Sequence, residues 1–324
     1  MKRSTRSLLS RLAIIAWAAA SLAWSPSRLV AAESPPSESQ LIAVLQSQAS
    51  PAEKAITCKK LAVYGSKHAV PALAPLLADP DLNAWARIGL EPIPGPEVDA
   101  ALRDALGKLK GRQLVGVILS LGVRRDPLAV AGLAAKLKGS DAQAISAAAD
   151  ALGRIGGDEA ARALTEALTT ASPVVRSDIA EGCIIGASGF LAAGESAKAL
   201  KLYDAVRAAA VSPQRKIEAT RGAILARGTA GLPLLLEQLN SPDKDSFAVG
   251  LSTARELPGA EVTTALAAQL PKTGPDRQPF VLLALADRHD PAGMPAIVEC
   301  ARTGPKATRI TALGVLEHAG DKAI

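Results

Sequence analysis

The sequence has 324 residues, of which 21% are charged and 2% are aromatic, and its formal net charge is +6. Five of the basic residues lie in residues 1–32, which contain no acid, so the remaining chain has 32 basic and 31 acidic residues, a net charge of +1. A nearly neutral chain with few, scattered aromatic rings does not indicate nucleic-acid binding or a stacked-ring sugar platform.

The N-terminus predicts an export signal. Four basic residues precede an apolar run at residues 12–24: Lys2, Arg3, Arg6 and Arg11. A short polar piece and the small residues Ala31 and Ala32 follow, which is the layout of a secretory signal peptide cleaved after Ala32. The apolar run is short for a membrane span of ~20 residues, so an uncleaved anchor is the less favoured alternative. We therefore expect residues 1–32 to be a signal peptide and the protein to be periplasmic or secreted, without stable membrane insertion after cleavage.

Residues 33–50 are polar, with Pro35 and Pro36, and predict a linker with a short first helix at residues 39–48.

From residue 51 onward one pattern recurs: an apolar helix, a polar turn, a second helix and a glycine or proline break. The first helix of each unit carries two apolar residues four positions apart, which lie on the same face of a helix. These pairs are Leu73/Leu77, Leu102/Leu106, Leu133/Leu137, Leu164/Leu168, Leu202/Val206, Leu235/Leu239, Leu266/Leu270 and Ile297/Ala301. Two helices of about 12 residues with two short turns fill about 31 residues, so each unit is a helical hairpin.

The turns between helices support this repeat. Cap residues followed by proline start the helices, as at Ser172, Ser212, Asp126 and Asp290, because proline tolerates the first helical position. The clearest helix lies at residues 140–157, where Ile145, Ala148, Ala149 and Leu152 form one apolar stripe before a glycine stop.

Two stretches depart from the repeat. Residues 186–194 are rich in glycine and predict a lengthened, flexible connection between the fourth and fifth units. Residues 320–324 predict the opening of a further unit that stops after a few residues.

The units resemble HEAT repeats, particularly the short bacterial kind named after phycobilisome lyases. The resemblance is carried by Ala69-Val70-Pro71-Ala72-Leu73 with Leu76-Leu77, by Asp141, and by Ala151-Leu152-Gly153-Arg154-Ile155-Gly156. Residues 58–65 with Trp85-Ala86-Arg87-Ile88 are similar to exported HEAT-repeat proteins of planctomycete-type bacteria. The resemblance covers about residues 55–324. It implies an all-α, right-handed α-α superhelix, a HEAT-like solenoid of about eight helical hairpins over residues 51–324.

No constellation of catalytic or metal-binding residues stands out. His68, His289 and His318 fall in different units, and the chain lacks the repeated His-Glu pairs of the HEAT-type hydroxylases that hold iron. Nucleophile, P-loop and dinucleotide motifs are missing as well. Cys58, Cys183 and Cys300 are widely spaced in apolar helices, which predicts buried small hydrophobic residues, although one disulfide pair stays open as an alternative. We expect no cofactor and no metal.

One local anomaly is a basic segment. Residues 103–138 contain eight basic residues against Asp104 and Asp126. Several of these lie at helix ends, where a lysine stabilises the helix dipole by ~0.3–1 kcal/mol. The alternative is a basic edge that docks an acidic protein or polysaccharide. This predicted basic edge consists of Lys108, Lys110, Arg112, Lys136 and Lys138.

These features predict a non-catalytic extracytoplasmic scaffold that binds a protein partner along the second helices. If the basic edge takes part in binding, the expected partner has an acidic surface. Candidate contact residues on those helices are Trp85, Arg87, Arg176, Arg215, Lys216 and Arg309. An alternative implied by the resemblance is an accessory N-terminal module of a secreted sugar-degrading enzyme, of the 3-keto-disaccharide hydrolase type, or of a haem enzyme, with a catalytic domain beyond residue 324. A lyase-like enzyme is the second alternative, and it rests on analogy of fold alone.

Overall fold

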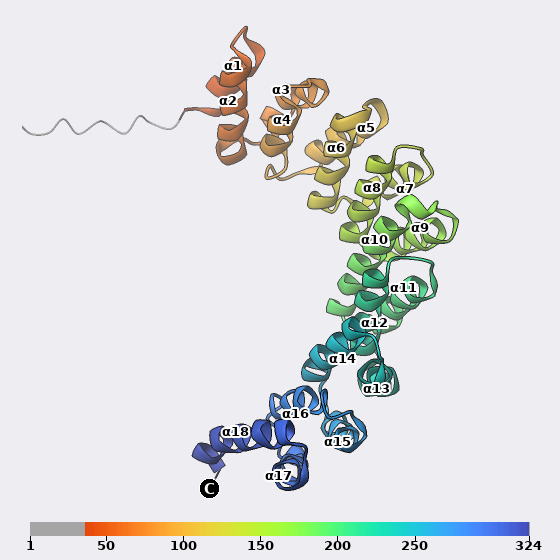
Figure 1. Ribbon diagram of the computed structural model, residues 1–324. Coiled ribbons are helices and arrows are strands. Elements are labelled where there is room, and N and C mark those ends of the chain that lie inside the picture. Colours follow the sequence, from red (N-terminus) through yellow and green to blue (C-terminus); the bar gives the residue numbers. More distant parts are fainter. Residues whose placement is uncertain (1–35, 324) are drawn as a thin grey trace, which may run out of the picture. The chain divides into compact units, whose positions relative to one another are not determined.

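A computed structural model describes residues 36–323 of the chain, with side-chain surroundings up to His318. Within that range the chain forms nine helical hairpins (Figure 1). The first helix of each hairpin is α1 (Glu38–Gln46), η1–α3–η2 (Lys67–Ala69, Val70–Leu73, Ala74–Ala78), α5 (Pro96–Lys108), η3–α7 (Pro127–Ala129, Val130–Leu137), α9 (Gly157–Thr170), α11 (Ser196–Ala208), η4–α13 (Gly228–Gly231, Leu232–Asn240), α15–η5 (Ala260–Gln269, Leu270–Lys272) and η6–α17 (Pro291–Gly293, Met294–Thr303). The second helices are α2 (Pro51–Tyr64), α4 (Asn83–Leu90), α6 (Gly111–Arg124), α8 (Ala142–Ile155), α10 (Pro173–Ala192), α12 (Pro213–Arg227), α14 (Lys244–Glu256), α16 (Gln278–Ala286) and α18 (Lys306–Ala323).

The hairpins stack in sequence order. Each second helix contacts the next second helix, from α2 through α18, and first helices such as α5, α7, α9 and α11 contact one another in the same order. Figure 1 shows these two rows of helices. A hairpin that packs only on its neighbours is the defining property of a solenoid. The predicted all-α array of HEAT-like hairpins is therefore confirmed, with nine hairpins in the described residues instead of about eight, because α1 and α2 form a hairpin of their own.

The apolar pairs of the first helices lie in the core as predicted. Their leucine, valine and isoleucine members are all buried, and only Ala301 is half-buried. The buried apolar residues form two clusters. One extends from Leu41 to Ala226 and the other from Ile224 to Ala312, so the two clusters meet in α12.

Side-chain caps start several helices. The carboxylate of Asp141 accepts hydrogen bonds from the backbone N–H groups of Gln143 and Ala144, which fixes the start of α8. Asp126 and Asp290 cap η3 and η6 in the same way, each followed by proline. The predicted stripe of α8 is fully buried. The predicted helix starts at these positions are therefore confirmed.

The prediction of a flexible connection at residues 186–194 is wrong. Helix α10 runs without interruption from Pro173 to Ala192, and the chain turns only at Gly194, where φ is 78°. The extra residues form helical turns because Phe190 is buried against the core and the hydroxyl of Ser188 hydrogen-bonds to the Tyr203 hydroxyl at 3.0 Å. The long interval in the repeat is thus a longer helix.

The prediction of a new unit opening at residues 320–324 is also wrong for the residues that the structure describes. Helix α18 continues to Ala323. A single glycine in a helix costs only about 1 kcal/mol relative to alanine, so Gly320 does not end it.

At the N-terminal end of the array, the short helix expected near residues 39–48 is α1, and it packs on α2 as a complete hairpin. None of the helices in residues 36–323 combines the length and the hydropathy that crossing a bilayer requires.

Candidate interaction surface

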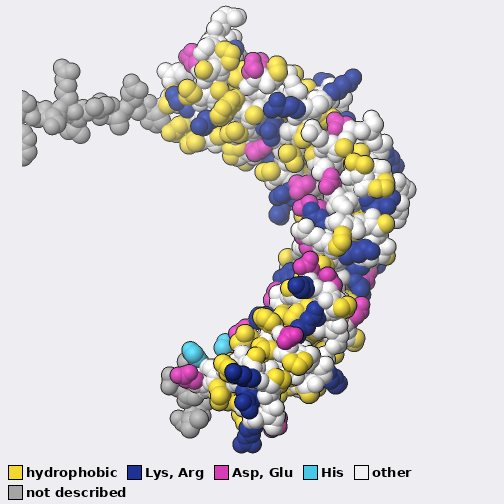
Figure 2. Space-filling view, viewed as in Figure 1, with side chains coloured by type: hydrophobic (Ala, Val, Ile, Leu, Met, Phe, Trp, Pro, Cys, Tyr) yellow, Lys and Arg dark blue, Asp and Glu magenta, His cyan; other side chains and the backbone are white. Residues whose placement is uncertain are grey.

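The outward faces of the second helices change character along the array. On α4 and α6 the exposed positions are largely apolar, including Ile88, Leu119 and Val123. On α8 and α10 this face carries the half-buried carboxylates Asp150 and Asp178, and the exposed large hydrophobic residue of α10 is Val174, near its start. Figure 2 shows hydrophobic side chains gathered over the N-terminal hairpins and more charged ones over the central hairpins.

A groove of about 720 Å³ lies where the two kinds of surface meet, across α4, α6, α8 and α10. Its lining residues are Arg87, Arg112, Val115, Gly116, Leu119, Ala142, Gln143, Ser146, Ala147, Asp150 and Asp178. Arg112 on one wall and Asp178 on the other form no ion pair with any described residue. The groove therefore presents one available cation and one available anion above a floor of small residues.

The first wall of the groove is held rigidly by Arg87. Its Nη1 donates to the carbonyl oxygen of Gly116 at 3.2 Å and to Ser120 Oγ at 3.3 Å, and it lies 3.6 Å from Glu91 Oε1. Ser120 Oγ in turn donates to Glu91 Oε1 at 2.6 Å. An added Cβ at Gly116 would lie 2.6 Å from Arg87 Nε, so a larger residue there would displace the Arg87 side chain from this network. This network ties α4 to α6 and neutralises Arg87.

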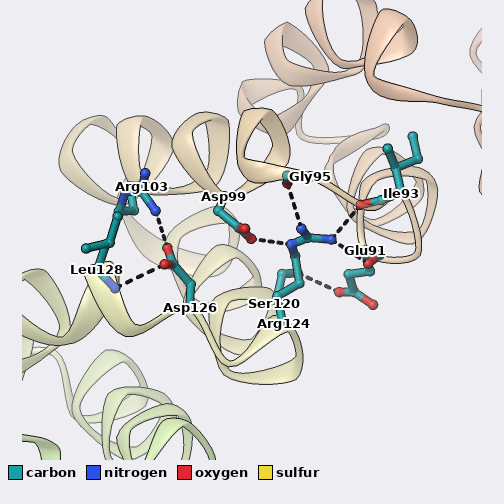
Figure 3. Close-up of polar contacts among 9 residues, drawn as sticks. All are labelled: Glu91, Ile93, Gly95, Asp99, Arg103, Ser120, Arg124, Asp126 and Leu128. Carbon is teal, nitrogen blue, oxygen red and sulfur yellow. Dashed lines mark hydrogen bonds and ion pairs between the residues drawn. The ribbon is translucent and has the colours of Figure 1, made fainter.

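A second arginine fastens the turn that leads from α4 into α5 (Figure 3). Arg124 is only 10% exposed, and its Nε forms an ion pair with Asp99. Its Nη1 donates to the carbonyl oxygens of Glu91 at 2.8 Å and Ile93 at 2.7 Å, and its Nη2 donates to that of Gly95 at 3.1 Å. We call this arrangement the Arg124 clip. It fixes one hairpin to the next, because its three carbonyl acceptors lie in the turn between α4 and α5, whereas Asp99 lies on α5 itself.

A similar clip recurs near the C-terminus. Arg288 donates to the carbonyl oxygens of Leu257 at 2.7 Å and Gly259 at 2.8 Å, and to Thr263 Oγ1 at 2.9 Å. Gly95 and Gly259 both have a φ of 113°, a conformation that favours glycine. These arginines were not among the predicted contact residues. The signal was present in the sequence: Ile93-Pro94-Gly95 recurs as Leu257-Pro258-Gly259, and Arg124 and Arg288 follow at equal distances.

The structure separates the members of the predicted basic edge. Lys108, at the end of α5, pairs with Asp104 at 2.6 Å, and both side chains are exposed. Lys110 and Arg112 begin α6, and Arg112 lines the groove. Lys136 and Lys138 lie at the end of α7, in the adjacent hairpin. The edge thus follows the turns between first and second helices, and its binding role stays a prediction.

The other candidate residues have different surroundings. Arg215 of α12 is held by Glu181 and Glu218. Trp85 of α4 lies beside α2, with Lys59 Nζ 5.6 Å from its ring centroid. Arg309 of α18 is exposed.

The three histidines and the three cysteines of the chain lie far apart on different helices and turns. His68, His289 and His318 lie on η1, the turn before η6 and α18, and the described residues hold no cluster of three metal-ligating side chains. Cys58 and Cys183 are buried free thiols, and burial raises the pKa of Cys58 to about 11 and that of Cys183 to about 12. Cys300 is half-buried, and burial followed by the charge of Glu299 raises its pKa as well. Thiols with raised pKa values are poor nucleophiles at neutral pH.

Comparisons with known proteins find likenesses of structure alone. No protein-family model and no curated protein matches the chain. Human deoxyhypusine hydroxylase in complex with glycerol aligns over 79% of this chain and 97% of its own, with 19% identity and a TM-score of 0.35. The CpcE–CpcF complex of phycocyanin lyase from Nostoc sp. PCC7120 aligns over 91% and 99%, with 19% identity and a TM-score of 0.33. An engineered protein aligns over 86% and 88%, with 17% identity and a TM-score of 0.40. Likenesses at this level carry no argument about activity.

Proposed function

We propose that this protein is a non-catalytic scaffold that binds a protein partner outside the cytoplasm, through the groove across α4, α6, α8 and α10. The single observation that carries the proposal is the pair of unpaired, opposite charges on the two walls, Arg112 and Asp178. Charged side chains on a helix surface ordinarily find partners or remain fully hydrated, whereas here both face a recess with a small-residue floor. A protein segment with complementary charges would satisfy both groups and bury the floor.

The groove suits a macromolecular partner better than a small molecule. It is open along the helix stack, and its floor is built from Gly116, Ala142 and Ala147, which allow another backbone to approach closely. Small-molecule sites are typically enclosed and lined by large apolar and aromatic side chains. The basic edge at Lys108, Lys110, Lys136 and Lys138 lies beside the groove and would attract an acidic partner over a longer range.

Charge reversal on either wall of the groove should weaken this interaction. We expect Arg112→Glu and Asp178→Lys each to reduce the affinity by about tenfold, which corresponds to about 1.4 kcal/mol. The partner would be isolated by affinity capture from the exported fraction and its binding then measured with purified proteins. Arg162→Glu, on the first helix α9, is the matched control because its side chain is exposed outside the groove. A partner that binds both groove variants as tightly as the wild-type chain would contradict the proposal.

The extracytoplasmic location gives a separate expectation. The predicted signal peptide and its cleavage site after Ala32 lie outside the described residues, so N-terminal sequencing and a deletion test them. We expect the exported protein to begin at Glu33 when its N-terminus is sequenced, and we expect deletion of residues 12–24 to retain the protein inside the cell. An exported protein that still begins at Met1 would show that the apolar run is an uncleaved anchor.

A further inference from the structure

The exposed surface beside the groove has an unusual composition. Contiguous side chains of three successive second helices form what we call the Trp85 patch: Lys59, Val63, Trp85, Ile88, Leu119 and Val123. Val63 is 73% exposed and Val123 is 58% exposed, whereas the remaining apolar members are less exposed. Isolated apolar residues on a surface are ordinary, but a contiguous set across three helices indicates a binding surface.

Contacts within the structure show that the patch is continuous. Lys59 of α2 lies over the ring of Trp85 of α4. Ile88 follows Trp85 by three residues, which places both on one side of α4. Arg87, which precedes Ile88, contacts Gly116 of α6, and Glu91 contacts Ser120, so these contacts flank Leu119. The patch therefore crosses from α2 to α6 and ends at the groove, which shares Leu119.

Basic side chains predominate around the patch, and Glu91, which directly follows α4, is paired with Arg87 at 3.6 Å. Helices α4 and α6 contain no acidic residue, and α2 contains one, Glu53. Lys59, Lys60 and Arg112 have no ion pair within the described part of the chain, and Lys59 is held by the Trp85 ring instead. A partner that covers this surface must bring both apolar side chains and negative charge.

We infer that the Trp85 patch binds an amphipathic segment of a partner protein in which bulky apolar side chains are flanked by Asp or Glu. This inference rests on the proposed function and names the chemistry of the partner. The apolar side chains pack on Trp85, Ile88 and Leu119, and the carboxylates pair with Lys59, Lys60 and Arg112. Such a segment would continue into the groove, where Asp178 accepts a basic residue, whereas Asp150 is already paired with Arg154 at 2.7 Å.

Two other occupants fit the surface less well. The exposed apolar residues at the far end of the array, Phe280 and Leu283 of α16 with Ile310 of α18, are accompanied by Lys306 and Arg309. A second copy docking through that end would bring cations against cations. An anionic bilayer would meet the acidic wall of the groove directly beside the patch, and like charges repel.

Synthetic peptides test the inference directly. The probe is an 18-residue helical peptide with leucine at i, i+3, i+4 and i+7 and glutamate at the flanking positions, and its matched control carries lysine in place of glutamate. The protein is the chain from Glu33, which includes the whole compact unit from Ser37 to Ile324. In that chain Trp85 is the only tryptophan, so its fluorescence reports on the patch itself.

We expect the glutamate peptide to shift the Trp85 emission and to bind at least tenfold more tightly than the lysine peptide. Lys59→Glu with Lys60→Glu should weaken binding at least fivefold, and Ile88→Ser should do the same. The matched controls are Lys201→Glu on α11 and Leu128→Ser on η3, which are exposed outside the patch and should leave binding unchanged. Circular dichroism confirms that each variant is folded.

Several results would overturn the inference. Equal binding of the two peptides would show that the patch does not select acidic side chains. No binding of either peptide would show that it does not bind an amphipathic segment. A Trp85 shift with vesicles of phosphatidylglycerol but not with the peptide would assign the patch to a membrane surface. Loss of a dimer in Ile88→Ser, measured by sedimentation, would assign it to a second copy. If the natural partner responds to Asp178→Lys but not to Lys59→Glu, the inference fails while the proposed function stands.

Discussion

Replacing Arg124 with alanine should lower the free energy of unfolding by about 3 kcal/mol. The change removes the guanidinium from the Arg124 clip, which leaves Asp99 without its cation and the carbonyl groups of Glu91, Ile93 and Gly95 without their donor. Breaking a buried ion pair costs ~3–5 kcal/mol. We expect the lower end of that range because Asp99 is 23% exposed and can gain water. Urea denaturation followed by circular dichroism measures the loss.

Two controls separate the clip from a general loss of charge. Arg255→Ala removes an exposed pair with Asp287 and should cost less than about 1 kcal/mol. Arg124→Lys should not restore stability, because an ammonium group cannot reproduce the planar set of donors that meets three carbonyls and a carboxylate. Hydrogen exchange should locate the loosening at α4–α6, since arrays of repeats can unfold locally. If Arg124→Ala and Arg255→Ala lower the free energy of unfolding equally, the Arg124 clip contributes no more to stability than an exposed ion pair.

Two glycines of α10 should respond to alanine in opposite directions. An added Cβ on Gly182 would lie 2.7 Å from the carbonyl carbon of Ala149 and 3.1 Å from its Cβ, so α8 and α10 would have to separate. Overpacking of this kind costs ~1–3 kcal/mol, and we expect about 3 because backbone atoms cannot move aside independently. An added Cβ on Gly189 meets nothing within 4 Å, so Gly189→Ala should stabilise the helix by about 0.5–1 kcal/mol.

Both variants are measured by thermal unfolding under the same conditions. Gly182→Ala tests the close approach of α8 and α10, where Gly153 lies opposite and a Cβ on it would be 2.5 Å from the Gly182 carbonyl oxygen. Gly189→Ala tests the continuity of α10, because a glycine in a flexible loop would not gain from a better helix former. A destabilised Gly189→Ala variant would contradict the helical assignment of residues 186–192.

The predictable parts of this fold are those encoded locally. The leucine pairs of the first helices and the caps at Asp126 and Asp290 depend on residues at most four positions apart, and they were predicted from the sequence. The continuity of α10 was missed because Gly186 and Gly189 lower local helix propensity, whereas the burial of Phe190 decides the outcome. Propensity is a weak preference that tertiary packing overrides.

The candidate site depends on contacts that bridge hairpins. Arg124 meets carbonyl groups about thirty residues earlier, so no local pattern reveals it, and its only signal in the sequence is the recurrence of the turn and the arginine in a distant hairpin. The basic edge was predicted from charge alone, and the projection of the side chains then placed only Arg112 in the groove. The face on which a residue lies depends on how its helix is rotated about its own axis. That rotation is set by packing against the neighbouring helices, which the sequence of one helix does not show.

The division of the apolar core at α12 has a mechanical consequence. Ala219, Ala223 and Ala226 belong to the first cluster and Ile224 to the second, and Leu234 of α13 packs against both, so the junction is formed by side chains of α12 and α13. In a stack of hairpins that contact only their neighbours, tension on the two ends is the same in every hairpin, so the part with the weakest packing yields first. The C-terminal cluster has fewer buried members than the N-terminal one, so we expect the C-terminal hairpins to yield before those that carry the groove and the Trp85 patch.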